Sequence, residues 1–245
     1  MKSIKNYLND SIEKEDYLNE SILDADKPAS LRAAKKEIRE WILANCKLRN
    51  GSKQITISDD FVVDCNCSIQ FRNANAKSLT NGKFKWGYVR DFFCGWTQIS
   101  SLEDSPRKCE VFNCEHCPLL TSLEGAPEEV TGRFECSGCN RLTTLKGAPK
   151  EVGSFICKYC QALKNLDGSP EVVNGWFDCS ECHGLQNFKG APKVITGRVR
   201  CKWCEGLKNF IGLPEKIGEW IECSGCDKLS ITDDDRKKYN IHDFD

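Results

Sequence analysis

The sequence of 245 residues predicts a repeat solenoid that is mainly β, with a helix and strands as a cap at its N-terminal end. The chief evidence is a repeat of about 22 residues in the second half of the chain, clearest in the copy from Arg133 to Val152. A fixed period of this length is typical of stacked turns that share one continuous core. One cysteine marks the start of each turn, and it recurs at Cys94, Cys114, Cys136, Cys157, Cys179, Cys201 and Cys223.

Charge and hydrophobicity exclude several classes of protein. The net charge is −1, so no bulk field recruits nucleic acid or an anionic membrane, and a hydrophobic fraction of 40% suffices for a packed core. No stretch reaches the roughly 18 apolar residues of a membrane span, and the N-terminus lacks the apolar core of a signal peptide. We therefore expect a cytoplasmic chain without membrane contact, whose 17 cysteines stay reduced.

The N-terminal third of the chain is expected to precede the array as a cap. Residues 1–28 form a polar N-terminal segment, and the cap itself occupies residues 29–88. Ser30 is the expected N-cap of a helix that runs to about residue 46. This helix should bury one apolar stripe at helical spacing, made of Ala34, Ile38, Trp41, Ile42 and Cys46.

Strands are predicted after this helix. Asn50-Gly51 is a turn signal, and residues 54–72 then change to a period of two, which predicts strands. Residues 79–82 and Val89 fit a degenerate first repeat that lacks the proline of later copies. Solenoids need an atypical first unit over their open end, so this region is expected to cover the array.

The array proper spans residues 89–231. In each turn a strand is followed by leucines that point inward and by a Gly-x-Pro element at the back of the turn. At Gly147 the glycine permits a positive φ, and at Pro149 the proline fixes φ. The charged residues 232–245 are expected to close the stack as a C-terminal cap or tail.

The repeat resembles the leucine-rich repeat family, whose turns read L-x-x-L-x-L-x-x-N/C-x-L. Phe134 and Cys136 match the strand pair of that pattern, Cys139 matches its N/C position, and Leu142 and Leu145 match the leucines that follow. The resemblance implies a curved solenoid that binds other macromolecules and has no shared catalytic residues. It also implies that the N/C position forms a buried ladder bonded to loop backbone. The chain departs from the family in its strand cysteine and its Gly-x-Pro return.

One stretch has a narrower resemblance. The segment from Leu120 to Pro127, Leu-Thr-Ser-Leu-Glu-Gly-Ala-Pro, is similar to segments in repeat proteins of bacteria and their phages. That resemblance implies a phage or bacterial structural component that uses the array as a rigid spacer.

Six Cys-x-x-Cys pairs follow the repeat. Buried structural thiol ladders are the favoured interpretation, because the first turn keeps Cys94 but has Thr97 where a metal site would need its second cysteine. No cofactor is then expected. Zinc is the alternative, since Cys136, Cys139, Cys157 and Cys160 have the spacing of a four-cysteine site. The ladder residues are Cys114, Cys117, Cys136, Cys139, Cys157, Cys160, Cys179, Cys182, Cys201, Cys204, Cys223 and Cys226.

The sequence offers no catalytic constellation. Its three histidines lie at unrelated positions of the repeat, and no phosphate loop or Ser/His/Asp set occurs. We expect a protein that is not an enzyme.

The outward positions of the strands offer a partner-binding face instead. Tryptophan, tyrosine and arginine dominate interface hot spots, and such residues cluster over the last four turns. They also fit a structural role, in which Arg198 stacks between Trp176 and Trp220 as a cation–π ladder. The candidate contact residues are Tyr159, Trp176, Arg198, Arg200, Lys202, Trp203 and Trp220.

Three functions follow, in order of preference. The first is a non-catalytic protein-interaction module whose partner is another protein. The second is a zinc-binding or single-stranded nucleic-acid-binding protein, which the balanced charge disfavours. The third is the spacer.

Overall fold

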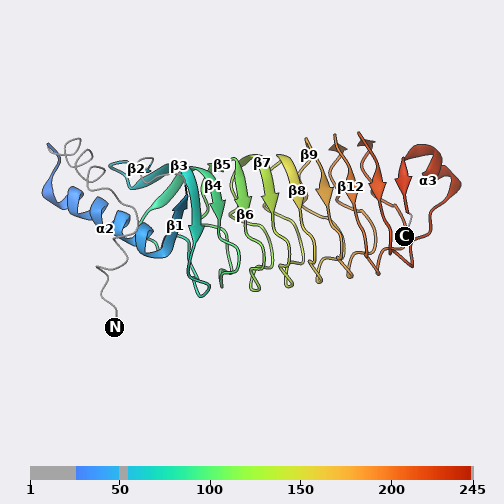
Figure 1. Cartoon of the computed structure of the whole chain (residues 1–245), viewed down its shortest axis with the longest axis horizontal. Helices are drawn as coiled ribbons and strands as arrows, with labels where there is room; N and C mark the ends of the chain where they lie inside the picture. The colour runs from blue at the N-terminus through green and yellow to red at the C-terminus, as the bar shows by residue number, and fades with distance from the viewer. Residues whose placement is uncertain (1–25, 50–54, 244–245) are drawn as a thin grey trace.

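The computed structural model describes residues 26–49 and 55–243. Stacked turns form an elongated β-solenoid with helix α2 (Ala29–Asn45) at one end and helix α3 (Asp233–Lys238) at the other (Figure 1). This confirms the predicted mainly β repeat solenoid. No helix in the described part of the chain is long and apolar enough to cross a membrane. Residues 1–25 of the predicted N-terminal segment and the Asn50-Gly51 turn lie outside the described residues.

The strands are short and follow the repeat. Those of the N-terminal region are β1 (Cys46–Arg49), β2 (Ile55–Ile57), β3 (Val62–Phe71) and β4 (Lys85–Phe93). The array continues with β5 (Lys108–Cys109), β6 (Val111–Asn113), β7 (Glu129–Glu135), β8 (Glu151–Ile156), β9 (Val172–Val173), β10 (Phe177–Asp178), β11 (Val194–Ile195), β12 (Val199–Arg200), β13 (Lys216–Ile217), β14 (Ile221–Glu222) and β15 (Ile241–His242).

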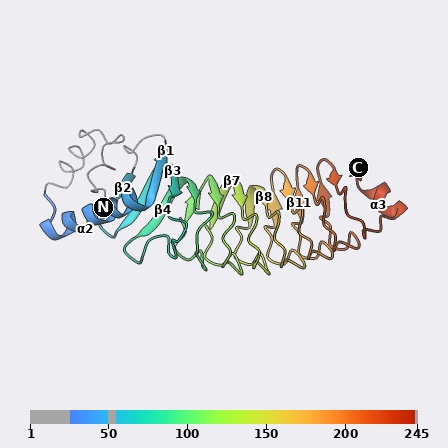
Figure 2. The same ribbon diagram turned by 60° about the horizontal axis from the view of Figure 1, so that its bottom comes forward.

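Successive turns pair in parallel, with equivalent residues side by side (Figure 2). Phe134 of β7 lies beside Phe155 of β8, which lies beside Phe177 of β10. β7 and β8 are single continuous strands, whereas later turns divide the same stretch into two short strands, such as β9 and β10. The register is fixed because a shift by one residue would turn the buried side chains outward.

The core consists of columns of identical or similar side chains, as the repeat predicts. The phenylalanine rings of neighbouring turns have their centroids 5.2 to 5.9 Å apart, within the range of favourable aromatic pairs. Leucines fill the space behind them, because they follow the inward turn of each repeat. The fully buried members include Phe92, Phe112, Phe134, Phe155, Phe177, Leu120, Leu142, Leu163, Leu185 and Leu207.

The helix and strands before the array cover its first turn. Ile38, Ile42 and Cys46 of the predicted stripe are buried, and β1 and β2 pair with β3 in antiparallel fashion. The predicted N-cap at Ser30 was wrong. The helix begins at Ala29, and the preceding Pro28 residue has φ −52° and accepts the first backbone hydrogen bond through its carbonyl. A proline thus starts the helix without a side-chain cap.

The C-terminal residues close the other end of the stack. Thr232 and Asp235 form a capping box, in which each side chain accepts a hydrogen bond from the backbone of the other residue. The short helix α3 then places β15 in parallel beside β14. The sheet thus ends in an edge strand of two residues, and so short an edge resists pairing with another chain.

One pair of cysteines departs from the expectation that all thiols are reduced. Cys65 and Cys67 form a disulfide within β3, with Cα atoms 5.3 Å apart. Both side chains face the core, since they are two residues apart in a strand, and the pairing of β3 with β4 shifts register around Cys65. The other 15 cysteines are free and buried.

Candidate interaction face

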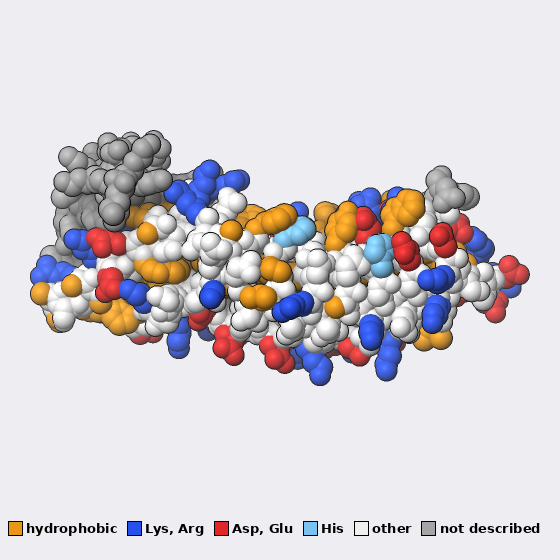
Figure 3. All heavy atoms as spheres, turned by 90° about the horizontal axis from the view of Figure 1, so that it is seen from below, with side chains coloured by type: hydrophobic (Ala, Val, Ile, Leu, Met, Phe, Trp, Pro, Cys, Tyr) orange, Lys and Arg blue, Asp and Glu red, His pale blue; other side chains and the backbone are white. Residues whose placement is uncertain are grey.

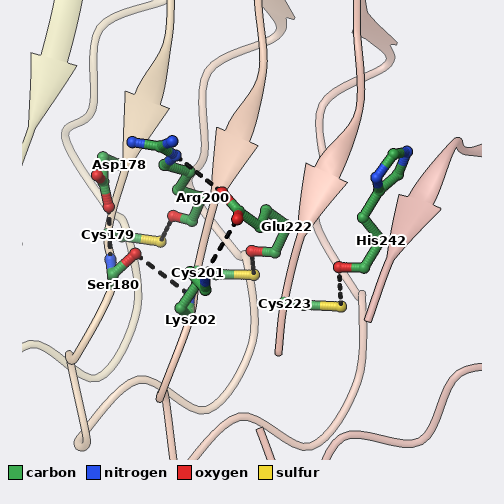
Figure 4. Close-up of polar contacts among 9 residues, drawn as sticks. All are labelled: Asp178, Cys179, Ser180, Arg200, Cys201, Lys202, Glu222, Cys223 and His242. Atoms are coloured by element: carbon green, nitrogen blue, oxygen red, sulfur yellow. Dashed lines mark hydrogen bonds and ion pairs between the residues drawn. The ribbon is translucent and has the colours of Figure 1, made fainter. Parts of the chain in front are cut away.

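The repeated cysteines form two ladders of thiols that hydrogen-bond the backbone. The second cysteine of a pair donates to the carbonyl of the first cysteine one turn earlier, as Cys139 does to Cys114 (3.3 Å) and Cys226 to Cys201 (2.9 Å). The first cysteine donates towards the following turn, as Cys179 does to the carbonyl of Arg200 (3.5 Å; Figure 4). The carbonyls of the first kind accept from the thiol of the next turn, whereas those of the second kind, such as that of Arg200, also accept from the backbone N–H of the same cysteine.

Thr97 supplies a hydroxyl donor at the second position of the first turn, but it bonds within its own turn and not to the preceding one. Its hydroxyl donates to the Cys94 carbonyl at 2.8 Å and lies 3.5 Å from the thiol of Cys117. A small donor, not sulfur itself, is therefore what the position requires. This explains why threonine can replace cysteine in the first turn.

The zinc alternative receives no support from this geometry. Cys139 and Cys160 of the proposed site point their thiols at backbone carbonyls, those of Cys114 and Cys136. In residues 26–49 and 55–243 no three His, Cys, Asp or Glu side chains come together as metal ligands would.

Burial makes Cys46, Cys109 and Cys117 weaker acids than a free thiol. It raises the pKa of Cys46 and of Cys109 to about 12 and, as the main cause among several, that of Cys117 to about 11. At neutral pH these thiols are protonated, so they act as hydrogen-bond donors and poor nucleophiles.

We expect the folded state to lose stability as the pH rises above about 9. Unfolded thiols ionise near pH 8.5, whereas Cys46, Cys109 and Cys117 stay protonated in the folded chain until their pKa values of about 12, 12 and 11. Stabilisation from a raised thiol pKa is complete below the unfolded value and is lost on rising through the folded one. Each such thiol lowers the free energy of unfolding by about 1.4 kcal/mol per pH unit.

Urea unfolding at several pH values between 7 and 9.5 measures this slope. The variant Cys46→Ala/Cys109→Ala serves as the control, since two ionising thiols are missing and its slope should be smaller. Equal stability at both ends of the pH range would contradict the assignment.

The predicted contact residues lie in the last four turns, some in or beside the strands and some in the turns that follow them, and they are not equally exposed. Trp176 is 40% exposed, Tyr159 39% and Trp203 55%, whereas Trp220 is half-buried. Figure 3 shows hydrophobic side chains along the upper edge of that view, with alternating acidic and basic side chains along the lower edge. Exposed aromatics in a repeated array are typical of a contact surface.

Arg198 lies between two indole rings. Its guanidinium carbon is 5.9 Å from the centre of the Trp176 ring and 5.8 Å from that of Trp220, within cation–π range. The ring of His242 stacks on the far side of Trp220, with centroids 5.6 Å apart. The structural alternative predicted for these residues is therefore present as a stack. We call Trp176, Arg198 and Trp220 the indole–guanidinium stack.

Arg200 and Lys202 are engaged with a neighbour in the next turn. Both donate to the carboxylate of Glu222, at 2.9 Å and 3.0 Å (Figure 4). Ser180 and Asp178 continue this polar band, since the Asp178 carboxylate accepts from the backbone N–H of Ser180. These two cations are less free for a partner than the sequence suggests.

A second row of side chains projects from the edge of the turns. It consists of the residues two positions after the first cysteine, and we call it the turn-edge row. Every member has φ between 52° and 71°, the left-handed region that favours glycine. The members are Trp96, His116, Gly138, Tyr159, Glu181, Trp203 and Gly225.

Hydrogen bonds between turns impose this conformation. The N–H of Trp96 donates to the carbonyl of Glu115 at 2.8 Å, and that of Trp203 donates to Ser224 at 3.0 Å. Bulky residues lose about 1–2 kcal/mol in left-handed geometry, and glycine would avoid that cost, as it does in two turns. Strained aromatics at the surface indicate a role other than stability.

One part of this row, the stack of Trp96 on His116, was not predicted from the sequence. Trp96 is 62% exposed and its ring stacks on His116 with centroids 3.9 Å apart. His116 in turn occupies the space over Gly138, where an added Cβ would lie 2.5 Å from the imidazole. The sequence does carry a signal for this row, because large aromatic residues and glycine occur at the same position of the repeat.

No family model, curated protein or solved structure matches the chain. Its function is therefore argued from the faces described above.

Proposed function

We propose that the chain is a non-catalytic protein-interaction module, and that its strand face over the last four turns is the contact surface. The observation that carries this proposal is the exposure of Tyr159, Trp176 and Trp203 on three successive turns of a rigid stack. Large aromatics presented on a rigid scaffold lose little conformational entropy on binding, which is why they anchor interfaces.

Two further features support the proposal. Tyr159 and Trp203 are held in strained left-handed geometry, although glycine fits that position elsewhere. The histidines are also occupied in surface contacts: His116 stacks on Trp96, His242 stacks on Trp220, and His183 lies 3.9 Å from Glu205. These contacts argue for recognition and against catalysis.

The resemblance to leucine-rich repeats belongs to this proposal. Each turn contributes a strand, and Cys139 at the family's N/C position hydrogen-bonds backbone, as the family's buried ladder does. A member of that family would use its strand side for partners, which agrees with the proposed face. The phage or bacterial spacer is less favoured, because the terminal strand β15 has only two residues and offers little edge for stacking.

Single-stranded nucleic acid is a poorer fit for this face. Such proteins need a continuous basic groove along the strand of phosphates. Here Glu222 pairs with both Arg200 and Lys202, and Glu181 lies on the preceding turn. A surface of mixed charge with exposed aromatics suits a protein partner better.

Capture from a lysate of the source cells tests the proposal. We expect the Trp176→Ala/Trp203→Ala variant to retain a partner at least about tenfold more weakly than the wild type, since each lost hot spot costs about 2 kcal/mol. Ile211→Ala is the matched control, because Ile211 is another large exposed apolar residue, 67% exposed, on the return segment. Equal retention by all three proteins would remove the proposed face.

A further inference from the structure

The indole–guanidinium stack contains a cation without an internal partner. The side chain of Arg198 makes no hydrogen bond or ion pair within the described residues, and its Nε atom is buried without an acceptor. In contrast, Arg200 and Lys202, which follow Arg198 in the same turn, both pair with Glu222. Two of these three cations thus have a carboxylate partner, whereas the guanidinium of Arg198 has none among the described residues.

The stack also fixes the orientation of that cation. A guanidinium is a planar fork of donors that matches a carboxylate in bidentate fashion. The rings of Trp176 and Trp220 flank the guanidinium from the two adjoining turns, which limits the directions from which a ligand can reach it. An arginine that is already ordered and partly desolvated gives up little side-chain entropy when it binds.

The surroundings favour an acidic ligand with an apolar neighbour. Arg200 and Lys202 share the single carboxylate of Glu222, and Arg198 precedes Arg200 by two residues, so the charges of these four residues sum to +2 although the whole chain has a net charge of −1. Trp176 offers its exposed ring beside the cation as an apolar contact. An isolated guanidinium suits a single carboxylate, whereas the carboxylates of nearby turns would repel an extended polyphosphate.

We propose that Arg198 recognises an aspartate or glutamate carboxylate in a protein partner, while an adjacent apolar side chain of that partner packs on Trp176. This rests on the proposed function and adds the chemistry of the partner to it. The partner segment would therefore be acidic and amphipathic, and its binding would weaken with salt because an exposed charge pair is screened.

Selection from a library of short random peptides displayed on yeast, with the full chain as bait, tests this. We expect the enriched peptides to contain aspartate or glutamate next to aromatic or aliphatic residues. Their affinity should fall at least about tenfold with Arg198→Gln, and also with Arg198→Lys, because an ammonium lacks the fork. The Ile211→Ala control should bind as the wild type does.

A measurement on the wild type guards against misfolding of the variants. In a selected peptide, replacement of each Glu by Gln should weaken binding to the unaltered chain by a similar factor. The inference is overturned if no peptide is enriched, if the enriched peptides are neutral or basic, if Arg198→Gln binds them equally, or if oligothymidine binds more tightly than they do. If the cellular partner is lost by Trp176→Ala/Trp203→Ala but kept by Arg198→Gln, the interaction module stands and its acidic specificity fails.

Discussion

Replacement of Phe155 by alanine is expected to lower the free energy of unfolding by about 4 kcal/mol, the upper part of the range for aromatic core truncations. Phe155 is fully buried, and its ring lies 5.2 Å from that of Phe134 and 5.8 Å from that of Phe177. Each turn contacts only its neighbours, so the cavity cannot be filled from elsewhere and both adjoining interfaces lose contacts. Urea unfolding followed by circular dichroism measures the change.

The Ile211→Ala variant provides the comparison. It also removes a large apolar side chain, but one that solvent already surrounds, so we expect a change within about 0.5 kcal/mol. If Phe155→Ala costs less than about 1 kcal/mol, the phenylalanine column does not carry the stack in the way described.

The second large effect concerns the back of the turn. We expect Gly147→Ala to destabilise the chain by about 3 kcal/mol, from left-handed strain and from steric conflict together. Gly147 has φ +96°, and an added Cβ would lie 2.3 Å from the carbonyl oxygen of Leu123 in the preceding turn. That oxygen belongs to the backbone and cannot move without separating the two turns.

Gly82 separates these two contributions. It also has a positive φ, +68°, but an added Cβ would meet nothing within 4 Å. Gly82→Ala should therefore show the conformational strain alone, about 1 kcal/mol. Equal losses for the two variants would show that the close approach of the turns at Gly147 is unimportant.

The sequence was sufficient to predict what repeats. Phe134, Leu142 and their equivalents form the core because a fixed period allows each side chain to meet its own copy in the next turn. Thr97 at the second position of the first turn agrees with a structural role for the cysteine pairs, since its hydroxyl also donates to a backbone carbonyl.

What escaped prediction depends on distances between turns, or on atoms outside the repeat. The stacking of Trp96 on His116 depends on the left-handed backbone of the turn-edge row. Aromatic residues rarely adopt that conformation, so their presence in the sequence does not predict it. The disulfide between Cys65 and Cys67 arises in a strand with irregular pairing, and periodicity gives no information about that. The free guanidinium of Arg198 is visible only once its neighbours are known to pair with Glu222.

The direction of the strands has a mechanical consequence. They lie across the long axis of the solenoid, so the hydrogen bonds between turns run along that axis (Figure 1). A force that pulls the two ends apart therefore loads these bonds one turn after another, as in opening a zipper, and not all together in shear. Under tension the chain would lengthen in steps of one turn, each releasing about 70 Å of extended backbone. A partner bound across several turns would clamp those steps together and stiffen the rod.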